Sequence, residues 1–348
     1  MTGFFLYEKM SPKVAIVILN FNTRHFLEKF LPGVLATKYD NFEVVLADNA
    51  SHDDSVSYVK SHFPSVKVIV LGGNYGYAGG YNRALEQVQA DYFVLLNSDV
   101  EVPQNWLQPL VDLAESDENI AAVQPKLLDY NDKTKFEYAG GSGGFIDKYG
   151  YPFCRGRWFH SLETDTHQYD DIREIFWATG ACFIIKSSLW NDAKGLDEDF
   201  FAHMEEIDLC WRLKNSGYKI MVCPQSIVYH VGGGTLPVGN PRKTFLNFRN
   251  GLYLLCKNLH GSQLWRVLFI RLVLDGTAGV KFMFEFKFKE IAAIFKAHWT
   301  FYLQLGYWLK KRKTLQSKPQ KAPTAMYQKS MVFDFFARGK RKFSETGL

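Results

Sequence analysis

The sequence predicts an α/β protein with a mainly parallel central sheet and helices on both faces. Within residues 14–96, four short apolar runs alternate with three helical stretches, which gives a βαβαβαβ order. The connections between them are short, so right-handed crossovers would place the strands side by side in one sheet. The last run, residues 92–96, is apolar throughout, as is typical of a strand buried on both faces.

The elements of this first half follow from the periodicity of the apolar residues. A helix start is indicated where Ser51 is followed three residues later by Asp54. After the fourth strand, Pro103 suits the first turn of a further helix. We expect strands over residues 14–21, 42–47, 66–71 and 92–96, and helices over 24–36, 53–62, 79–88 and 104–116.

The second half is expected to add antiparallel pieces to this core. The glycine-rich segment 139–144 predicts a hairpin or a mobile loop, and Gly180 permits close backbone approach within a strand region. A helix over 205–216 would end at Gly217. We expect strands over residues 121–128, 175–186, 219–223 and 226–230.

The composition favours a cytoplasmic protein with a substantial core. Of the 348 residues 47% are hydrophobic, and the five cysteines are widely spaced without a CxxC pair. Neither a zinc site nor a disulfide framework is indicated, and a reducing compartment fits. Residues 1–10 lack the basic start and apolar core of a signal peptide. No apolar run approaches the roughly 20 residues that span a bilayer.

Charge is divided unevenly along the chain. Residues 241–348 hold 21 Lys and Arg against 5 Asp and Glu, a net charge of +16, whereas the remainder has a net charge of −11. Aromatic residues interleave with Lys and Arg between 264 and 309, and the basic cluster 310–313 follows. Basic amphipathic helices with aromatic faces suit an anionic membrane surface. The alternative, that part of these aromatic residues packs on the core, stays open. No nucleic-acid recognition motif accompanies the charge.

These patterns predict four segments. They are an N-terminal extension over residues 1–12, a main domain over 13–255, basic aromatic amphipathic helices over 256–315 and a flexible tail over 316–348. The tail begins with a stretch rich in Lys, Pro, Gln and Ala, which is typical of a linker or disordered segment. We expect peripheral attachment to the inner face of the membrane.

Polar side chains follow the second and fourth predicted strands. Asp48 and Asn49 end the second, and Asn97 and Asp99 follow the fourth. In open α/β sheets the ligand crevice lies at the carboxyl ends of the strands. A carboxylate there can hold a divalent cation, and a neutral imidazole such as His230 is a suitable further ligand. Each of these residues, taken alone, is also common in turns and at helix caps, where it has no role in binding.

Two other motifs indicate a site. Residues 74–82 carry glycines at the opening of a helix, where a backbone can approach a ligand, but they match neither GxGxxG nor GxxxxGK[ST]. A dehydrogenase or a P-loop enzyme is therefore not supported. The acidic residues between 197 and 208 surround a helix start. They either complement the helix macrodipole or provide a general base.

The ordered set of these motifs resembles the family 2 glycosyltransferases, with the rhamnosyltransferase-like branch nearest. The resemblance covers about residues 13–255. Its motifs are residues 17–22, 48–49, 74–82, 95–99, 179–181, 195–198, 201–212 and 229–230. The family implies the GT-A fold and an inverting, nucleotide-sugar-dependent reaction.

The resemblance implies roles for individual residues. Asp99 would bind Mg or Mn, His230 would approach the metal or the diphosphate, and Glu206 would occupy the position of the catalytic base. The family's Asp-x-Asp appears here as Asn97-Ser98-Asp99, and its Glu-Asp pair as Glu205-Glu206. Glu205, Asp208 and Asp197 remain alternatives for the base. The implied donor-binding residues are Asn20, Asn22, Asp48, Asn49, Asn74, Gly79, Asn82, Asn97 and Gly180.

The expected function is transfer of a sugar, with inversion, from a nucleoside-diphosphate donor to a glycan or lipid-linked acceptor in cell-surface polysaccharide synthesis. The loop over 232–239 is expected to order over the diphosphate. Two other functions are alternatives. A sugar-phosphate nucleotidyltransferase expects a glycine-rich, basic signature that residues 18–23 lack. A non-catalytic scaffold that binds membrane or glycan would show no donor turnover.

Overall fold

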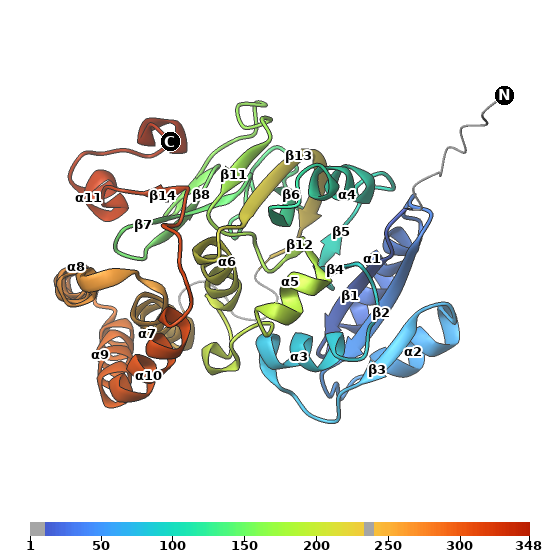
Figure 1. Ribbon diagram of the computed structural model, residues 1–348, viewed down its shortest axis with the longest axis horizontal. Helices are drawn as coiled ribbons and strands as arrows, with labels where there is room; N and C mark the ends of the chain where they lie inside the picture. The colour runs from blue at the N-terminus through green and yellow to red at the C-terminus, as the bar shows by residue number, and fades with distance from the viewer. Residues whose placement is uncertain (1–10, 233–239) are drawn as a thin grey trace.

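The computed structural model of the protein describes residues 11–232 and 240–348 (Figure 1). Its centre is a mixed sheet in the order β11-β13-β6-β12-β4-β1-β2-β3, with β5 paired to β13. The first half runs β1 Val14–Asn20, α1 Arg24–Leu35, β2 Phe42–Asp48, α2 Ser55–His62, β3 Lys67–Val70, α3 Gly76–Leu85 and β4 Tyr92–Asn97. β1 pairs in parallel with both β2 and β4, and β2 with β3, so the predicted parallel half is confirmed.

The second half of the sheet adds the expected antiparallel strands. β12 pairs antiparallel with β4, whereas β13 runs parallel to β6. Two short strands were predicted around Pro224, but the structure has one strand, β13, with a register shift between Cys223 and Ile227, as suits a proline that cannot donate to the ladder. The elements are β5 Val100–Glu101, α4 Leu107–Glu115, β6 Ile120–Asp129, β11 Arg173–Ile175, β12 Cys182–Lys186, α5 Ser187–Asp192, η1 Glu198–Phe200, α6 Glu205–Asn215 and β13 Lys219–His230.

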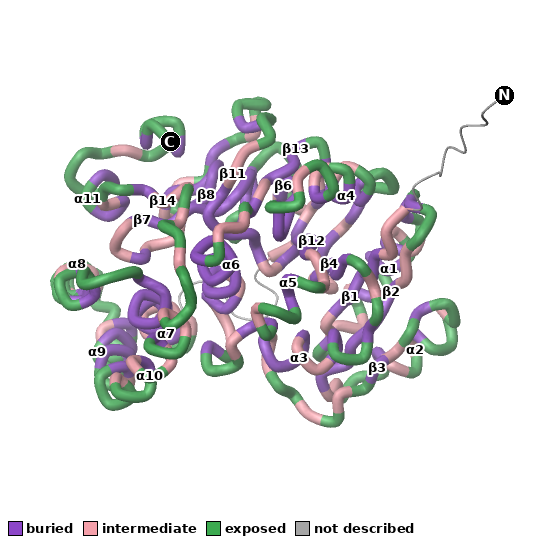
Figure 2. Tube along the Cα trace, in the orientation of Figure 1, coloured by how far each residue is buried: buried purple, intermediate pink, exposed green. Residues whose placement is uncertain are grey.

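The core lies on both faces of this sheet. Alternate residues of β1 enter two separate hydrophobic clusters, Ala15 and Val17 on one face and Ile16 and Ile18 on the other. Side chains of successive strand residues point to opposite faces, so both faces must be covered. Figure 2 shows the central strands as largely buried.

A second, smaller sheet contains the C-terminal segment. Its order is β10-β9-β8-β7-β14, and β14 pairs in parallel with β7. The expected flexible tail over 316–348 is therefore corrected. Phe343 packs against Phe145 with ring centroids 4.8 Å apart, because aromatic residues beyond the polar stretch complete the core of this sheet. The elements are β7 Gly144–Asp147, β8 Pro152–Cys154, β9 Arg157–Trp158, β10 Ser161–Leu162, β14 Met326–Tyr327, α11 Met331–Phe336 and η3 Phe343–Thr346.

The basic, aromatic region forms helices that gather at one end of the molecule, opposite β1, β2 and α2 (Figure 1). They are α7 Pro241–Asn258, α8 Leu264–Phe284, α9 Phe288–Leu303 and α10 Leu305–Gln316, with η2 Gly261–Gln263 before α8. Part of the aromatic set packs inward: Trp308 is fully buried and stacks on Tyr253 at 4.0 Å. Within residues 11–232 and 240–348, none of the helices combines the length and apolar character that crossing a bilayer requires.

Candidate active site

The strand ends of the parallel half carry a network of amide and carboxylate side chains. Asn20, at the end of β1, donates from Nδ2 to Asp48 at 2.8 Å, and Asp48 also accepts from the backbone of Ser51. Asn49 donates to the Asn74 side chain at 3.2 Å and accepts from the Tyr75 N–H. Four of the predicted donor-binding residues, Asn20, Asp48, Asn49 and Asn74, are thus brought together at one edge of the sheet.

The remaining predicted donor-binding residues lie around this network. Asn22 has a φ of 56° and accepts from the His52 N–H at 2.7 Å. The Asn97 N–H donates to Ala181 at 2.9 Å. Gly180 accepts from the Tyr77 hydroxyl at 2.6 Å, and a Cβ at Gly180 would lie 2.8 Å from that hydroxyl, so the glycine permits this close approach.

Asn82 does not face the network. It accepts from the Leu196 N–H and donates to the Leu196 carbonyl, both at 2.9 Å, and so clamps the acidic segment 195–198 onto α3. Gly79 lies one turn earlier on α3, where a Cβ would come within 2.9 Å of Tyr75 Cβ. Asn82 therefore acts through hydrogen bonds and Gly79 through close packing, and neither offers a free polar group to a ligand.

Asp99 and His230, the two predicted metal ligands, lie side by side. The short strand β5 pairs with Tyr229 and His230 of β13, which places Asp99, just after β4, beside the imidazole. Asp99 Oδ1 lies 3.2 Å from His230 Nε2. The other ring nitrogen, Nδ1, lies 3.2 Å from an oxygen of Glu137, which the sequence analysis missed because it is 93 positions away and belongs to no strand end.

The charge of His230 follows from these neighbours. Burial disfavours the imidazolium, but the Glu137 and Asp99 carboxylates outweigh that cost and raise the pKa of His230 to about 10. Without a cation the three residues therefore form a buried carboxylate–imidazolium–carboxylate chain. A cation held by Asp99 and Nε2 would replace the proton, and Glu137 would fix the ring through Nδ1.

These residues fit a divalent cation only in part. Asp99 and His230 offer one carboxylate and one imidazole, which suit Mg²⁺ or Mn²⁺, but a full shell needs further oxygen ligands. Among the described residues, one cluster has three side chains that could together hold a metal ion. It consists of Asp165, His167 and Asp170, whose ligand atoms all lie within 4.8 Å of one another. In this cluster the Lys126 ammonium already forms ion pairs with Asp165 and Asp170, so it neutralises the charge that a metal ion would need. Asp99 therefore remains the better metal position if a bound diphosphate completes the shell.

The predicted base lies at the start of α6, after a strained turn. Phe201, His203 and Met204 have φ values of 64°, 69° and 75°, a region that non-glycine residues seldom adopt. Asn250 of α7 holds this turn, since its Nδ2 donates to the carbonyls of Phe200, Ala202 and His203 at 2.8–3.0 Å. The clamp comes from a helix outside the recognisable motifs, so the sequence did not indicate it.

Glu205 and Glu206 are both held away from water. Burial, together with the neighbouring Glu206 charge, raises the pKa of Glu205 well above its usual range. Burial raises the pKa of Glu206 to about 7, although backbone N–H groups at the helix start oppose the shift. Glu206 Oε2 is buried without a hydrogen-bond partner, and Glu206 lines a cavity. A carboxylate with these properties can accept a proton at neutral pH.

The other two acidic alternatives are committed to ion pairs. Asp208 is fully buried and accepts from Arg212, Lys257 and Asn258 at 2.7–2.8 Å. Asp197 accepts from Lys257 and from Lys311 of α10. Although burial opposes ionisation, the cationic partners hold the pKa of both carboxyls below the usual range. Both oxygens of Asp208 and of Asp197 accept hydrogen bonds in this structure, so these two residues are less suited to take a proton than Glu206.

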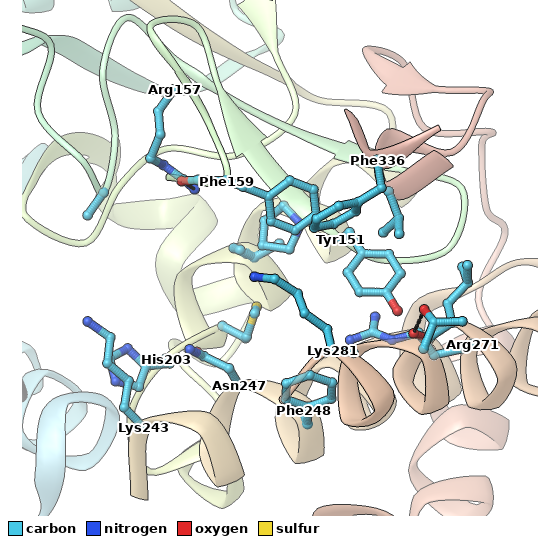
Figure 3. A pocket seen from close by; sticks show the side chains of 18 of the residues that line it. Tyr151, Arg157, Phe159, His203, Lys243, Asn247, Phe248, Arg271, Lys281 and Phe336 are labelled. Carbon is cyan, nitrogen blue, oxygen red and sulfur yellow. Dashed lines mark hydrogen bonds between the residues drawn. The ribbon is translucent and has the colours of Figure 1, made fainter. Parts of the chain in front are cut away.

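The cavity beside Glu206 has a volume of about 970 Å³. Figure 3 shows its walls, with Lys243, Asn247 and Phe248 on α7, Arg271 and Lys281 on α8, and Arg157 on β9 of the second sheet, flanked by Tyr151 just before β8 and Phe159 just after β9. This volume is at the upper end for small-molecule sites. The predicted loop over 232–239 lies, apart from Gly232, outside the described residues.

Comparison with known proteins gives a family match over half of the chain. The family model described as "Glycosyl transferase family 2" matches residues 15–190. The N-acetylglucosaminyl-diphospho-decaprenol L-rhamnosyltransferase of Mycobacterium tuberculosis is 24% identical over 237 residues, 64% of this chain and 76% of that protein. The low-salt glycan biosynthesis hexosyltransferase Agl10 of Haloferax volcanii is 25% identical over 303 residues, 83% of this chain and 91% of that protein.

A solved structure shares the arrangement of the core. The crystal structure of GalNAc-T7 with UDP, GalNAc and Mn²⁺ matches with a TM-score of 0.56 and 16% sequence identity. The match covers 72% of this chain and 48% of that chain, so it spans about half of the larger protein. At this identity the likeness concerns the fold alone.

Proposed function

The chain belongs to glycosyl transferase family 2 and has the GT-A fold; from that premise we propose that it transfers a sugar from a nucleoside-diphosphate donor to a hydroxyl of a glycan or lipid-linked acceptor, with inversion at the anomeric carbon. The observation that carries this proposal is Glu206, a half-buried glutamate beside a large cavity, whose Oε2 is buried without a hydrogen-bond partner and whose pKa is raised to about 7 by burial. A general base of this kind suits removal of a proton from a hydroxyl.

The donor would bind at the strand ends of the parallel half. Asp48, held by Asn20, has the position in which an acidic residue accepts hydrogen bonds from a nucleoside. The N-terminal end of α3 would face the phosphates, because backbone N–H groups at a helix N-terminus favour negative charge. The presence of UDP and Mn²⁺ in the GalNAc-T7 structure supports a nucleotide donor and a divalent cation for this chain as well.

Asp99 and His230 would hold the cation, with Glu137 orienting the imidazole. A bound divalent cation supplies charge neutralisation for the diphosphate that leaves the sugar. The chain's own residues would do the remaining work. Glu206 takes the proton of the acceptor hydroxyl as that oxygen forms a bond to the anomeric carbon. The bond from this carbon to the diphosphate oxygen breaks on the opposite side, so the configuration inverts.

The direct test is a screen of nucleotide sugars. We expect one nucleotide sugar in a panel to raise the melting temperature in the presence of Mn²⁺, and chelation to reverse that rise, because binding to the folded state alone stabilises it. The same donor should lose its sugar to water or to an acceptor. A nucleotidyltransferase would instead release diphosphate from a nucleoside triphosphate. Stable binding without any turnover of a donor would support the scaffold.

The acceptor would be reached at a membrane surface. Large aromatic side chains are exposed around the turn between α8 and α9, where Phe284 and Phe286 are 77% and 80% exposed and Phe286 has a φ of 57°. Lys287, which also pairs with the exposed Glu285 at 2.7 Å, and Lys289 are exposed beside them. Exposed aromatic side chains with flanking lysines suit an anionic bilayer. The cluster 310–313 contributes less than expected, since Lys311 pairs with Asp197 and Arg312 binds backbone carbonyls.

Neutralising Lys287 and Lys289 with Gln is expected to lower partitioning onto anionic liposomes by about tenfold or more, since each lysine near such a surface contributes about 1 kcal/mol. Co-sedimentation at low salt measures this, and added salt should reduce binding of the parent protein. The matched control exchanges Lys60 and Lys67, which are exposed at the opposite end of the molecule. Equal sedimentation with neutral and anionic liposomes would remove the electrostatic part of the proposal.

A further inference from the structure

The cavity beside Glu206 extends far beyond the residues that the family model matches. Its floor comes from α7 and α8, and one side comes from α11, all of which follow residue 190. Figure 3 shows that α11 contributes Phe336, which faces Phe159 of the second sheet with ring centroids 5.3 Å apart. The C-terminal segment therefore completes a wall that the catalytic core alone lacks.

One end of the cavity is polar and positively charged. Arg157 lines it from the second sheet and Lys243 from α7, on opposite sides in Figure 3. The Arg157 guanidinium is 8% exposed and binds only a backbone carbonyl and the Cys154 sulfur, while its Nε has no partner. Among described residues no carboxylate forms an ion pair with it. The guanidinium lies 4.5 Å from the centre of the Tyr138 ring, and Cys154, Tyr138 and Glu137 favour its charge against the effect of burial. Its Nε still lacks an acceptor, which an anion in the cavity would supply.

His203 belongs to the same end. Its Nε2 is buried without a partner, and burial, reinforced by Lys243, lowers its pKa to about 4. It is therefore a neutral group that can donate or accept one hydrogen bond at pH 7. Since Glu206 also lines the cavity, an anion held between Arg157 and Lys243 would lie near the base.

The other end is apolar. Figure 3 places Tyr151 and Phe336 there, away from His203 and Lys243. Arg271 is neutralised by Asp275 at 2.8 Å, so it adds no free charge. The hydrophobic side chains of this end come from α8 and α11 and are Leu274, Ala278, Phe282, Val332, Phe333 and Phe336. A carbohydrate would leave its hydroxyls unpaired against such walls, whereas a hydrocarbon chain would not.

We propose that this cavity binds an amphiphilic acceptor, with a phosphate or diphosphate group between Arg157 and Lys243 and a hydrocarbon chain along α8 and α11. The proposal rests on the proposed function, since the acceptor hydroxyl would then reach Glu206. The apolar end lies at the last turn of α8, where Phe282 lines the cavity, and the exposed Phe284 and Phe286 follow at the turn to α9. A chain embedded in a bilayer could enter from that side.

Binding of farnesyl diphosphate, measured by calorimetry without any donor, tests the proposal. It should bind at least about tenfold more tightly than either inorganic diphosphate or farnesol, because each of these satisfies only one end. Ala278→Trp, which fills the apolar end from α8, should weaken binding by about tenfold or more. Ala292→Trp, on the exposed side of α9, is the matched control and should bind like the parent protein.

Ala337→Trp blocks the same end from α11 and replaces Ala278→Trp if that variant fails to fold. Arg157→Lys keeps the charge but loses the guanidinium fork, and should weaken the diphosphate compound while leaving farnesol unchanged. The proposal is overturned if farnesyl diphosphate binds no better than inorganic diphosphate or farnesol, or if the folded blocking variant binds it normally. Because no donor is present, these results stand apart from sugar transfer. Loss of binding in Ala278→Trp with unchanged donor hydrolysis would leave the enzyme assignment intact.

Discussion

Replacing Glu206 with Gln is expected to lower kcat by about a hundredfold or more while donor binding is retained. Glutamine keeps the size of the side chain and its hydrogen bonding but cannot accept a proton. The measurement is the steady-state rate with the donor found in the nucleotide-sugar screen, with thermal stabilisation by that donor as the check on binding. Glu205→Gln is the matched control, since Glu205 is the adjacent, more deeply buried glutamate and does not line the cavity.

The pH dependence of kcat/KM tests the role of Glu206 independently of the substitution. Burial raises the pKa of Glu206 to about 7, so its carboxyl is protonated and inactive below that pH and ionised above it. We expect kcat/KM to rise with pH between about 6 and 8 and then to level off. This acid limb should be absent from the residual activity of Glu206→Gln. If Glu205→Gln is the inactive variant and Glu206→Gln keeps its rate, the assignment of the base is wrong.

Removing the Asp99 carboxylate is expected to lower sugar transfer by about a thousandfold or more, which corresponds to the several kcal/mol that a metal ion contributes to charge stabilisation. Asp99→Ala removes the only carboxylate at the end of β4 that lies against His230. Asp99→Asn keeps the shape but not the charge and should lose nearly as much. The measurements are the transfer rate at saturating Mn²⁺ and Mn²⁺ binding by calorimetry in the presence of the donor's nucleoside diphosphate.

The control for Asp99 is Asp170→Ala, in the surface cluster with Asp165 and His167. Lys126 keeps its ion pair with Asp165 in this variant, so the fold should survive and the Mn²⁺ requirement should be unchanged. Full activity of Asp99→Ala in excess chelator would end the proposal of a metal at Asp99. Loss of the metal requirement in Asp170→Ala would instead locate the metal at the surface cluster.

The parallel half of the fold and the location of its site were readable from the sequence because they follow from local patterns. A run such as residues 92–96 can be accommodated only by a strand covered on both faces, and polar residues after β2 and β4 must share one edge of a parallel sheet. The order of the motifs along the chain also indicated the resemblance to the family 2 glycosyltransferases. The strong positive charge of residues 241–348 indicated a separate role for the C-terminal helices.

The tail shows where local patterns failed. Composition alone made residues 316–348 a flexible segment, yet Tyr327 and Phe343 are buried against the second sheet. Scattered aromatic residues without periodicity give no local signal, and only the presence of a matching apolar surface on β7 and β8 makes their burial favourable.

The sequence by itself determined the parallel core, the edge that carries the candidate site and the set of acidic candidates. The tertiary structure decided which of those candidates has a free oxygen and also lines the cavity. Glu206 and Asp208 are two positions apart on α6 and so face different sides of the helix, but periodicity does not say which side meets cations. Lys257 of α7 lies on the side of Asp208 and neutralises it, while Glu206 faces the cavity. Contacts between segments far apart in the chain set the charge state of a buried carboxylate, and the local sequence does not encode those contacts.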